Sequence, residues 1–517
     1  MKTLRSYVGG QWREARAGFA PLHDPCTEEV IAQASSDGVD FGAALEHARE
    51  VGGPALRALT FAERGELLLA ASKALHACRD ELIELSLRNS GTTRKDAKFD
   101  LDGATGTLSF YAYLGKELGD RRYLVDGEGV ALGRSARFYG QHLLLPLTGA
   151  AVHINAFNFP AWGFAEKAAC AWLAGVPVIT KPATSTALVT ERCIEILVEA
   201  KLLPAGALAL IVGSTGDLLS RLGPQDAFGF TGSADTALRL RGLPNLLAKS
   251  VRVNIEADSL NAAVLGPDVS PGSETCNLFL REVEREMTQK TGQKCTAVRR
   301  VFIPKERMDE VQAALIERLS AVVTGNPADS SVTMGPLATA QQLADGVAGI
   351  ARLAGDARIV HGSGLRADGV GATPGRGYFL APTLLRADDA ESTQNVHSHE
   401  VFGPVATLLP YDGSAAVAAR LCARAEGTLV TSVYSDDDSW AASFVVDGGP
   451  WAGRIYLGSE KMAEQALGSG VALPQSLHGG PGRAGGGEEL GGKHGLSLYL
   501  RRVALQGSRA MVGKLAD

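Results

Sequence analysis

The stretch AVHINAFNFPAWGFAEKAACAWLAGVPVITKPA, residues 151–183, decides the fold class. An apolar run at Ala151–Ile154 is followed by a helix-like segment at Ala161–Ala174 and by a second apolar run at Val176–Thr180. Short β-rich runs that alternate with helical segments are typical of parallel strands joined by helical crossovers. This stretch therefore predicts a β-α-β unit of a doubly wound α/β sheet.

The alternation continues through a helical segment at Ser185–Lys201 and three more β-rich runs, at Ala207–Gly213, Ala227–Thr231 and Val251–Ile255. In such sheets the carboxyl ends of the strands face a ligand crevice. Polar or glycine residues follow four of the five runs: Asn158 the first, Lys181 the second, Gly232 and Ser233 the fourth, and Glu256 the fifth. We expect these residues to share one crevice.

The flanking segments extend the prediction. Thr60 and Glu63 have capping-box spacing, which predicts one long amphipathic helix through Leu87 with Gly91 as its stop. After Glu256, a strand at Arg299–Ile303 and a helix near Met308–Val323 predict a second lobe.

Composition narrows the class of protein. The 517 residues include 51 Lys and Arg against 57 Asp and Glu, and a net charge of −6 argues against a basic nucleic-acid-binding protein. Seven scattered cysteines without a CxxC pair indicate reduced thiols of a cytosolic protein, with no metal site. The first residues, MKTLRSYVGGQWREA, have no apolar run and indicate no signal peptide, and prolines and glycines interrupt the uncharged stretch 138–165 too often for a membrane helix. We expect a cytoplasmic enzyme of two or three lobes, with no membrane or nucleic-acid partner.

The segment His478–Gly495 is half glycine. Such a composition is typical of a flexible linker. However, a strand-like run at Ser497–Leu505 follows, so the segment is held at both ends.

Cys295 lies in TGQKCTAV, beside a lysine. A thiol near a cation and backbone N–H groups is biased toward the nucleophilic thiolate. The alternative is that Cys295 is a small buried hydrophobic residue.

Three strand-end residues have their own alternatives. Glu256 closes the apolar run SVRVNIEA, where burial would raise its pKa and make it a base near neutrality; otherwise it is a surface residue. The Asn158 amide can donate to a developing oxyanion, or it is a turn residue before a helix. Lys181 can reach a nucleotide ribose or phosphate, or it ends its strand at solvent.

Eight motifs in order resemble the aldehyde dehydrogenase superfamily over nearly the full chain. They are FNFP with Asn158, ITKPA with Lys181, GFTGS with Gly232 and Ser233, Glu256, GQKC with Cys295, MGPL at Met334–Leu337, GYFLAPTLL from Gly377, and HEVFGPV with Glu400 and Phe402. The tail LPQSLHGGPGRAGGGEELGG resembles dehydrogenases of aerobic, CoA-dependent aromatic degradation. The chain ends at Asp517 without the hydratase domain of the phenylacetate enzyme, which favours the benzoyl-CoA type.

The resemblance implies a fold with three parts. These are a Rossmann-like, doubly wound cofactor domain (1–128 and 148–256), an α/β catalytic domain (257–481) and a small β extension (129–147 and 496–517). The hairpin near Gly129–Leu147 and the C-terminal strand would leave open edges on a monomer, which predicts a homodimer or a dimer of dimers.

The resemblance also implies roles for the site residues. Cys295 attacks the aldehyde, Asn158 holds the oxyanion, and Glu256 activates the water that hydrolyses the thioester. Lys167 and Glu489 relay a proton to or from Glu256, although the adjacent Glu488 leaves that assignment open. The implied substrate is an aliphatic, CoA-linked semialdehyde such as 3,4-dehydroadipyl-CoA semialdehyde of benzoate catabolism.

The cofactor implied is NADP. The residues assigned to it are Lys181, Thr184, Ser185, Gly232, Ser233, Glu400 and Phe402. Many NAD-preferring members have a glutamate at the position of Thr184, and removing that carboxylate lifts its repulsion toward a 2′-phosphate. Two further departures from the family are Ala257–Asp258 in place of two glycines and Ala237 in place of a glycine.

Four alternative functions remain open. A general NAD(P) aldehyde dehydrogenase for a free aldehyde is one, and a CoA-acylating enzyme is another, although Glu256 argues against the second. A third alternative is a cofactor-free thiol hydrolase, but such an enzyme has no use for Lys181 or Glu400, so their presence argues against it. A fourth is a non-catalytic relative that keeps the fold, and the presence of Cys295 and Glu256 argues against that one.

Overall fold

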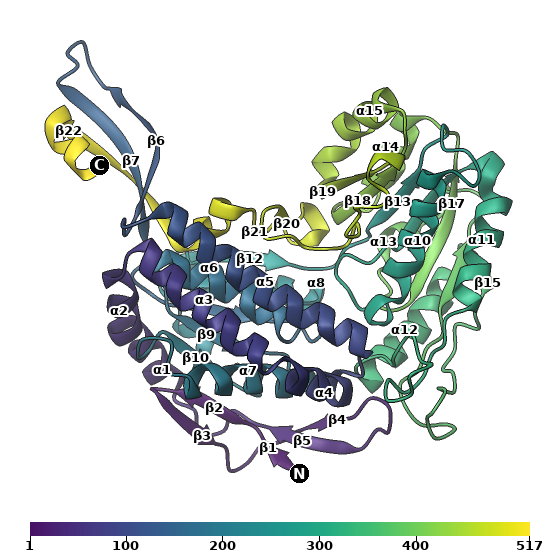
Figure 1. Ribbon diagram of the computed structural model, residues 1–517, viewed down its shortest axis with the longest axis horizontal. Coiled ribbons are helices and arrows are strands. Elements are labelled where there is room, and N and C mark those ends of the chain that lie inside the picture. The colour runs from purple at the N-terminus through teal and green to yellow at the C-terminus, as the bar shows by residue number, and fades with distance from the viewer. Residues whose placement is uncertain (517) are drawn as a thin grey trace.

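Two seven-stranded sheets form the two lobes of the computed structural model, which describes residues 1–516 (Figure 1). The strands of the first sheet lie between residues 5 and 256, and those of the second between residues 262 and 458. The doubly wound α/β arrangement expected for the first lobe is confirmed. Asp517 lies outside the described residues.

The first sheet has the order β12-β11-β8-β9-β10-β2-β3. The five strands predicted from alternation pair in parallel, whereas β2 and β3 are antiparallel additions from the N-terminus. The bounds are β2 Arg5–Val8, β3 Gln11–Glu14, β8 Ala151–Ile154, β9 Val178–Lys181, β10 Leu208–Leu210, β11 Ala227–Thr231 and β12 Arg252–Glu256. Because β8 and β11 are buried along almost their whole length, their sequences are continuous apolar runs.

Helices α3 (Phe61–Ala77), α5 (Arg94–Leu118) and α6 (Trp162–Ala174) pack against one another beside this sheet (Figure 1). The capping box at Thr60 is present as predicted. The single helix expected through Leu87 is wrong, because the backbone leaves helical geometry at Cys78 (φ −101°, ψ 18°) and restarts as α4 (Arg79–Ser90). Gly91 ends α4 in a left-handed conformation, as expected of a C-terminal glycine.

The second sheet has the order β15-β16-β17-β14-β13-β18-β19, and all its strands except β15 are parallel. Its strands are β13 Ala262–Leu265, β14 Arg300–Pro304, β15 Arg358–His361, β16 Thr383–Arg386, β17 Val405–Tyr411, β18 Thr428–Tyr434 and β19 Ala452–Gly458. Its helices include α10 Glu274–Thr288, α11 Met308–Ser320, α12 Ala340–Leu353, α14 Ala415–Ala423 and α15 Asp438–Gly448. The predicted strand at Arg299–Ile303 and helix near Met308 correspond to β14 and α11.

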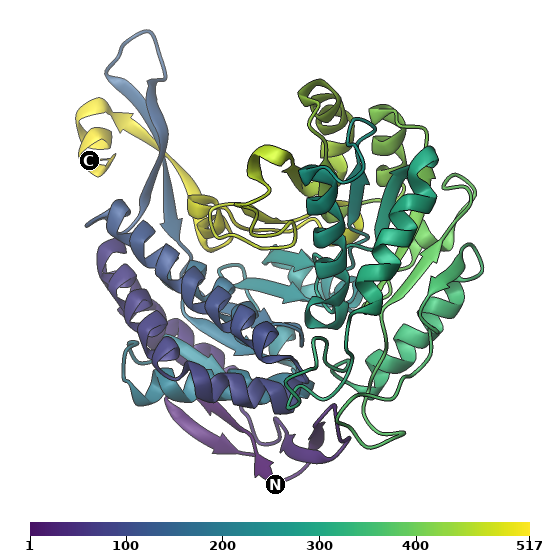
Figure 2. The same cartoon turned by 45° about the vertical axis from the view of Figure 1, so that its right-hand side comes forward.

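A three-stranded arm extends away from both lobes (Figure 2). Strands β6 (Leu124–Ala131) and β7 (Phe138–Pro146) form the predicted hairpin, and β22 (Leu500–Ser508) pairs antiparallel with β7 over nine residues. The C-terminal strand thus begins three residues later than Ser497, because residues Gly492–Tyr499 form 3-10 turns. The outer edges of β6 and β22 have no neighbouring strand among residues 1–516.

The glycine-rich segment crosses between the lobes as an ordered element (Figure 1). Strands β20 (Leu477–Gly479) and β21 (Glu488–Leu490) pair antiparallel within it, so the flexible-linker alternative is wrong. Glycine is required here, since a Cβ at Gly479 would lie 2.0 Å from the carbonyl oxygen of Gly487. None of the described helices has the length and apolarity that crossing a lipid bilayer requires.

Candidate active site

A narrow pocket collects side chains from the first sheet, from α6, from the loop before β14 and from β20. Cys295, Glu256, Asn158, Lys167 and His478 all line it, and the free space at its centre is about 40 Å³. The structure therefore brings together three of the strand-end and loop residues that the sequence singled out.

Cys295 is positioned by a sharp turn after α10. Lys290, Thr291 and Gly292 follow one another in left-handed backbone conformations, and a Cβ at Gly292 would lie 2.2 Å from the Gly403 carbonyl oxygen. The Asn261 side chain then donates to the Cys295 carbonyl at 2.7 Å. Glycine and an amide anchor thus fix the loop that presents the thiol.

The expected bias of Cys295 toward thiolate is wrong for this state of the site. Burial, followed by the carboxylate of Glu256, raises the pKa of the thiol well above its usual value. The neighbouring Lys294 ammonium contributes little because it pairs with Glu286 at 2.7 Å and donates to Gln289 at 2.8 Å. The thiol is therefore neutral in the arrangement described.

Glu256 ends β12 and is 2% exposed. Burial alone would raise the pKa of its carboxyl, but the charges of His478 and Lys167 outweigh burial and lower the pKa to about 2. The raised pKa expected from the apolar strand is therefore wrong, since the sequence around β12 gives no sign of these cations. Glu256 is ionised over the whole physiological range.

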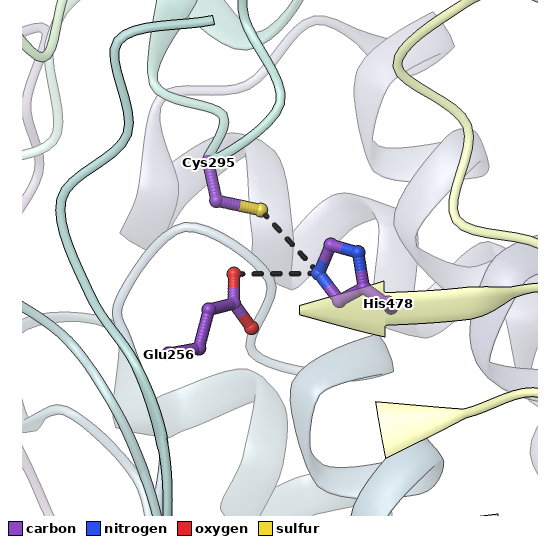
Figure 3. A group of neighbouring side chains, drawn as sticks. All are labelled: Glu256, Cys295 and His478. Atoms are coloured by element: carbon purple, nitrogen blue, oxygen red, sulfur yellow. Dashed lines mark hydrogen bonds and ion pairs between the residues drawn. The ribbon is translucent and has the colours of Figure 1, made fainter. Parts of the chain in front are cut away.

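His478 lies between the thiol and the carboxylate (Figure 3). Its Nε2 is 3.3 Å from Glu256 Oε1 and 3.8 Å from Cys295 Sγ. Burial would lower the pKa of the imidazole, but Glu256 raises the pKa above its usual value. The raised pKa favours the protonated imidazole, which forms an ion pair with the Glu256 carboxylate.

Lys167 lies on α6 and is 3% exposed. The α6 N-terminus is held by Asp100, whose carboxylate accepts from the Trp162 N–H at 2.9 Å. The Lys167 ammonium contacts Glu166 and Glu489 at 3.0 Å each, and these carboxylates raise its pKa although burial would lower it.

Glu489, and not Glu488, faces this interior. Its carboxylate binds Lys167 and accepts from Asn254 at 2.8 Å, whereas Glu488 contacts the exposed His494 at 2.7 Å. Alternation along β21 sends the two neighbours to opposite faces. Carboxylate oxygens of Glu166, Glu256 and Glu489 lie within 4.8 Å of one another.

Asn158 lies in the turn between β8 and α6 and is 8% exposed. Its side-chain amide donates to the Gln293 carbonyl at 3.0 Å, in the loop that carries Cys295. An amide nitrogen carries two hydrogens, so one remains for an oxygen bound in the pocket.

A second crevice holds the residues expected to bind the adenosine end of a cofactor. Lys181, at the end of β9, and Thr184 line a cavity of about 470 Å³ together with Ser214 and Thr215. Burial lowers the pKa of Lys181 to about 8, and the ammonium makes no ion pair with any residue between 1 and 516. A half-buried cation that faces an open cavity and has no ion-pair partner among residues 1–516 fits a ligand phosphate. Ser185 does not line this cavity, and its carbonyl accepts from Asn89.

Some of the first backbone N–H groups of α8 (Ala234–Arg241) already donate hydrogen bonds to side chains of this protein. The hydroxyl of Ser233, the N-cap, accepts from the Thr236 N–H, and the Asp258 carboxylate accepts from the Ala234 N–H at 2.9 Å. The departure at Ala257–Asp258 thus places a charge at this helix end. Gly232 is confined, since a Cβ there would lie 2.6 Å from the Phe230 ring.

Glu400 and Phe402 lie beside Arg299. Glu400 pairs with Arg299 at 3.4 Å and accepts from the Ser259 N–H at 3.2 Å; burial raises its pKa to about 7. The Phe402 ring packs edge-to-face on Phe157, with 5.8 Å between ring centres.

Two sets of side chains are close enough for a metal ion: Glu256 with Cys295 and His478, and Glu166 with Glu256 and Glu489. In both sets carboxylates already contact a basic side chain, His478 beside Glu256 and Lys167 beside Glu166 and Glu489. We therefore interpret both sets as ion-paired protein groups.

Sequence reasoning missed His478 and Glu166. His478 precedes two glycines in a segment whose composition indicated only a loop, and Glu166 is adjacent in sequence to a residue assigned to the site. Glu166 could have been identified from the sequence, because it is a carboxylate next to Lys167 on the same helix. No motif or spacing in the sequence connected His478 with the site.

Comparison with known proteins agrees with this geometry. The sequence profile of the aldehyde dehydrogenase family matches residues 12–503. The chain belongs to the aldehyde dehydrogenase family. A 3,4-dehydroadipyl-CoA semialdehyde dehydrogenase of Aromatoleum evansii is 47% identical over 479 residues, covering 92% of this chain and 93% of that one.

Several solved structures share the fold. PnpE from Pseudomonas sp. WBC-3 is 22% identical, with a TM-score of 0.84 and 98% of both chains covered. Betaine aldehyde dehydrogenase from Staphylococcus aureus, solved with NAD⁺, is 23% identical with a TM-score of 0.84, covering 98% of this chain and 94% of that one. A 3,6-anhydro-L-galactose dehydrogenase solved with NADP is 21% identical, with the same TM-score and coverage of 98% and 100%.

Proposed function

We propose that this aldehyde dehydrogenase oxidises an aliphatic, CoA-linked semialdehyde, such as 3,4-dehydroadipyl-CoA semialdehyde, to the corresponding acid with NADP. The observation that carries the proposal is the convergence of Cys295, Glu256 and Asn158 on one narrow pocket. The pocket admits a slender aldehyde chain, and the A. evansii relative supports the choice of substrate.

Each residue has a chemical task in this scheme. Cys295 Sγ attacks the aldehyde carbon, while the free N–H of Asn158 stabilises the oxyanion, a contribution typically worth about 2.7–4 kcal/mol. Bound NADP supplies the hydride acceptor. Glu256 then takes a proton from water, which hydrolyses the thioester on Cys295, and Lys167 with Glu489 passes that proton onward.

The cofactor choice rests on Lys181 and Thr184. A 2′-phosphate beside these residues would receive a charge-assisted hydrogen bond from the ammonium and a hydroxyl donor, with no carboxylate to repel it. The nicotinamide end would lie near Glu400 and Phe402, with the diphosphate near Gly232 and Ser233.

A CoA-linked substrate is supported by a second cavity at the pocket mouth. This cavity of about 510 Å³ shares Phe99, Trp162 and Ala472 with the catalytic pocket. Lys95 and Lys98 line it, and neither forms an ion pair within residues 1–516. They are placed to meet the phosphates of a CoA moiety whose acyl chain enters the pocket.

We also propose which segments of the chain perform which functions. Residues 1–128 and 148–256 hold the cofactor, residues 257–481 carry the nucleophile, and the arm at 129–147 and 496–517 pairs with a second subunit in a cytoplasmic homodimer or dimer of dimers.

The decisive test compares kcat/KM for the CoA-linked and free semialdehydes, each with NADP and with NAD, and identifies the product. We expect the free acid, with the CoA-linked substrate favoured about tenfold or more. Lys95→Glu with Lys98→Glu should erase that preference, whereas Lys116→Glu, an exposed control on the same helix, should not. A new thioester in place of the acid would establish the CoA-acylating alternative, and equal use of both aldehydes would remove CoA from the proposal.

A further inference from the structure

His478 is a buried titratable group that the scheme above leaves without a task. Its strand, β20, pairs with β21 so that His478 lies opposite Glu489, and its side chain is 4% exposed. The backbone at this point has no freedom, because Gly453 approaches the Gly479 carbonyl so closely that a Cβ would lie 1.7 Å from its oxygen. The fold therefore confines the backbone that carries the imidazole beside Glu256 and Cys295.

A single nitrogen of His478 faces both reacting partners. Nε2 is 3.3 Å from the Glu256 carboxylate and 3.8 Å from the Cys295 sulfur. Figure 3 draws both contacts from the same ring nitrogen. Nδ1 has no hydrogen-bond partner among the described residues. The same Nε2–H can therefore stabilise negative charge on either the carboxylate or the sulfur.

The charges around His478 set its state. The negative charges of Glu256 on β12 and Glu166 on α6 favour the protonated imidazole, whereas the positive charge of Arg454 on β19 opposes it. Cys295 carries no charge in this state. Glu489, opposite His478 on β21, is paired with Lys167. The acidic groups prevail, and the pKa of His478 is raised despite burial.

We propose that His478 is a third catalytic residue, whose Nε2 lies within reach of both the Glu256 carboxylate and the Cys295 sulfur and donates its hydrogen bond to the Cys295 thiolate when Glu256 takes the thiol proton. The S–H bond breaks and an O–H bond forms on Glu256, while the imidazolium keeps its own proton. Negative charge thus moves from oxygen to sulfur beside a fixed positive charge. This inference rests on Cys295 being the nucleophile of the proposed function.

The test is the pH dependence of Cys295 alkylation by iodoacetamide, measured by peptide mass spectrometry on the cofactor-free enzyme with EDTA present. In His478→Gln we expect the midpoint of the rate profile to rise by about one pH unit and the rate at pH 7 to fall about tenfold, because the positive charge beside the sulfur is lost. His494→Gln is the matched control, since His494 also pairs with a glutamate in this segment but is exposed.

A second variant separates chemistry from structure. In His478→Ala, added imidazole should restore part of the alkylation rate, whereas it should not accelerate His478→Gln, which fills the site. An unchanged midpoint in His478→Gln, or no imidazole response in a folded His478→Ala that still binds NADP, overturns the proposal. Because alkylation needs no turnover, either result is independent of whether the parent enzyme oxidises the CoA-linked aldehyde.

Discussion

Replacing Lys167 with methionine removes an ammonium that contacts two buried carboxylates, Glu166 and Glu489, at 3.0 Å each. Methionine keeps the apolar stem, so the packing of α6 changes little. Breaking a buried ion pair by removing one partner costs about 3–5 kcal/mol, because the remaining charge is left uncompensated. For a chain of this length that loss lowers the melting temperature by about 3–5 °C, given an unfolding entropy of about 2 cal/mol/K per residue.

The loss should depend on pH in a defined direction. Burial raises the pKa of Glu166 to about 7, with the charge of Lys167 opposing the shift. A carboxyl whose pKa is raised on folding gives most stability below its unfolded pKa, and that stability falls as pH rises through the folded value. Without Lys167 the folded pKa rises further, so we expect Lys167→Met to be more destabilised at pH 8 than at pH 6, where Glu166 takes up a proton.

The assay is thermal denaturation followed by circular dichroism at one scan rate and at both pH values. Lys305→Met is the control, because Lys305 is 66% exposed beside Glu306 and should change the melting temperature by less than about 1 °C. Adding Glu489→Gln to Lys167→Met should restore part of the loss by removing an unpaired charge. Equal shifts at pH 6 and pH 8, or a shift no larger than the control, would refute the charge argument.

Four further outcomes follow from the site and the arm. Cys295→Ala should abolish dehydrogenation while NADP still binds, as tryptophan quenching would report; appreciable turnover would end the covalent mechanism. Glu256→Gln should release one burst of NADPH and then stall with a thioester on Cys295, and near-parent turnover would assign the base to another group. Thr184→Glu should raise the KM for NADP and erase a preference over NAD of about tenfold in kcat/KM, whereas equal efficiencies in the parent would show that other residues decide. Light scattering at micromolar concentration should report a dimer or tetramer; a monomer would contradict pairing through the arm.

Local patterns predicted the five parallel strands of the first sheet because most of their residues are buried, whereas the partly exposed β2 and β3 were not predicted. The runs at Ala151–Ile154 and Ala227–Thr231 became β8 and β11 with those bounds, since an apolar run ends where the strand leaves the core. The break at Cys78 was not predictable in the same way. The apolar pattern continues through it, and neither proline nor glycine marks the position.

The site was predictable only where sequence order and family motifs placed residues on one edge of a sheet. Asn158, Glu256 and Cys295 were found in this way. The protonation states were not, because each depends on a partner far along the chain. Glu256 is ionised through His478, more than 200 residues later, and Lys294 is drawn away from Cys295 by Glu286 on the preceding helix.

These pairings explain why a reactive thiol can lie in a buried pocket and remain neutral. Three carboxylates, from Glu166, Glu256 and Glu489, surround the ammonium of Lys167 and the imidazole of His478. Burial, followed by the negative charges of Glu256 and Glu166, opposes a thiolate on Cys295 and raises the pKa of the thiol. A proton that moves from sulfur to Glu256 shifts negative charge onto Cys295 without changing the total charge of the pocket. The low-dielectric surroundings therefore penalise this internal transfer less than a thiolate formed by losing the proton to solvent.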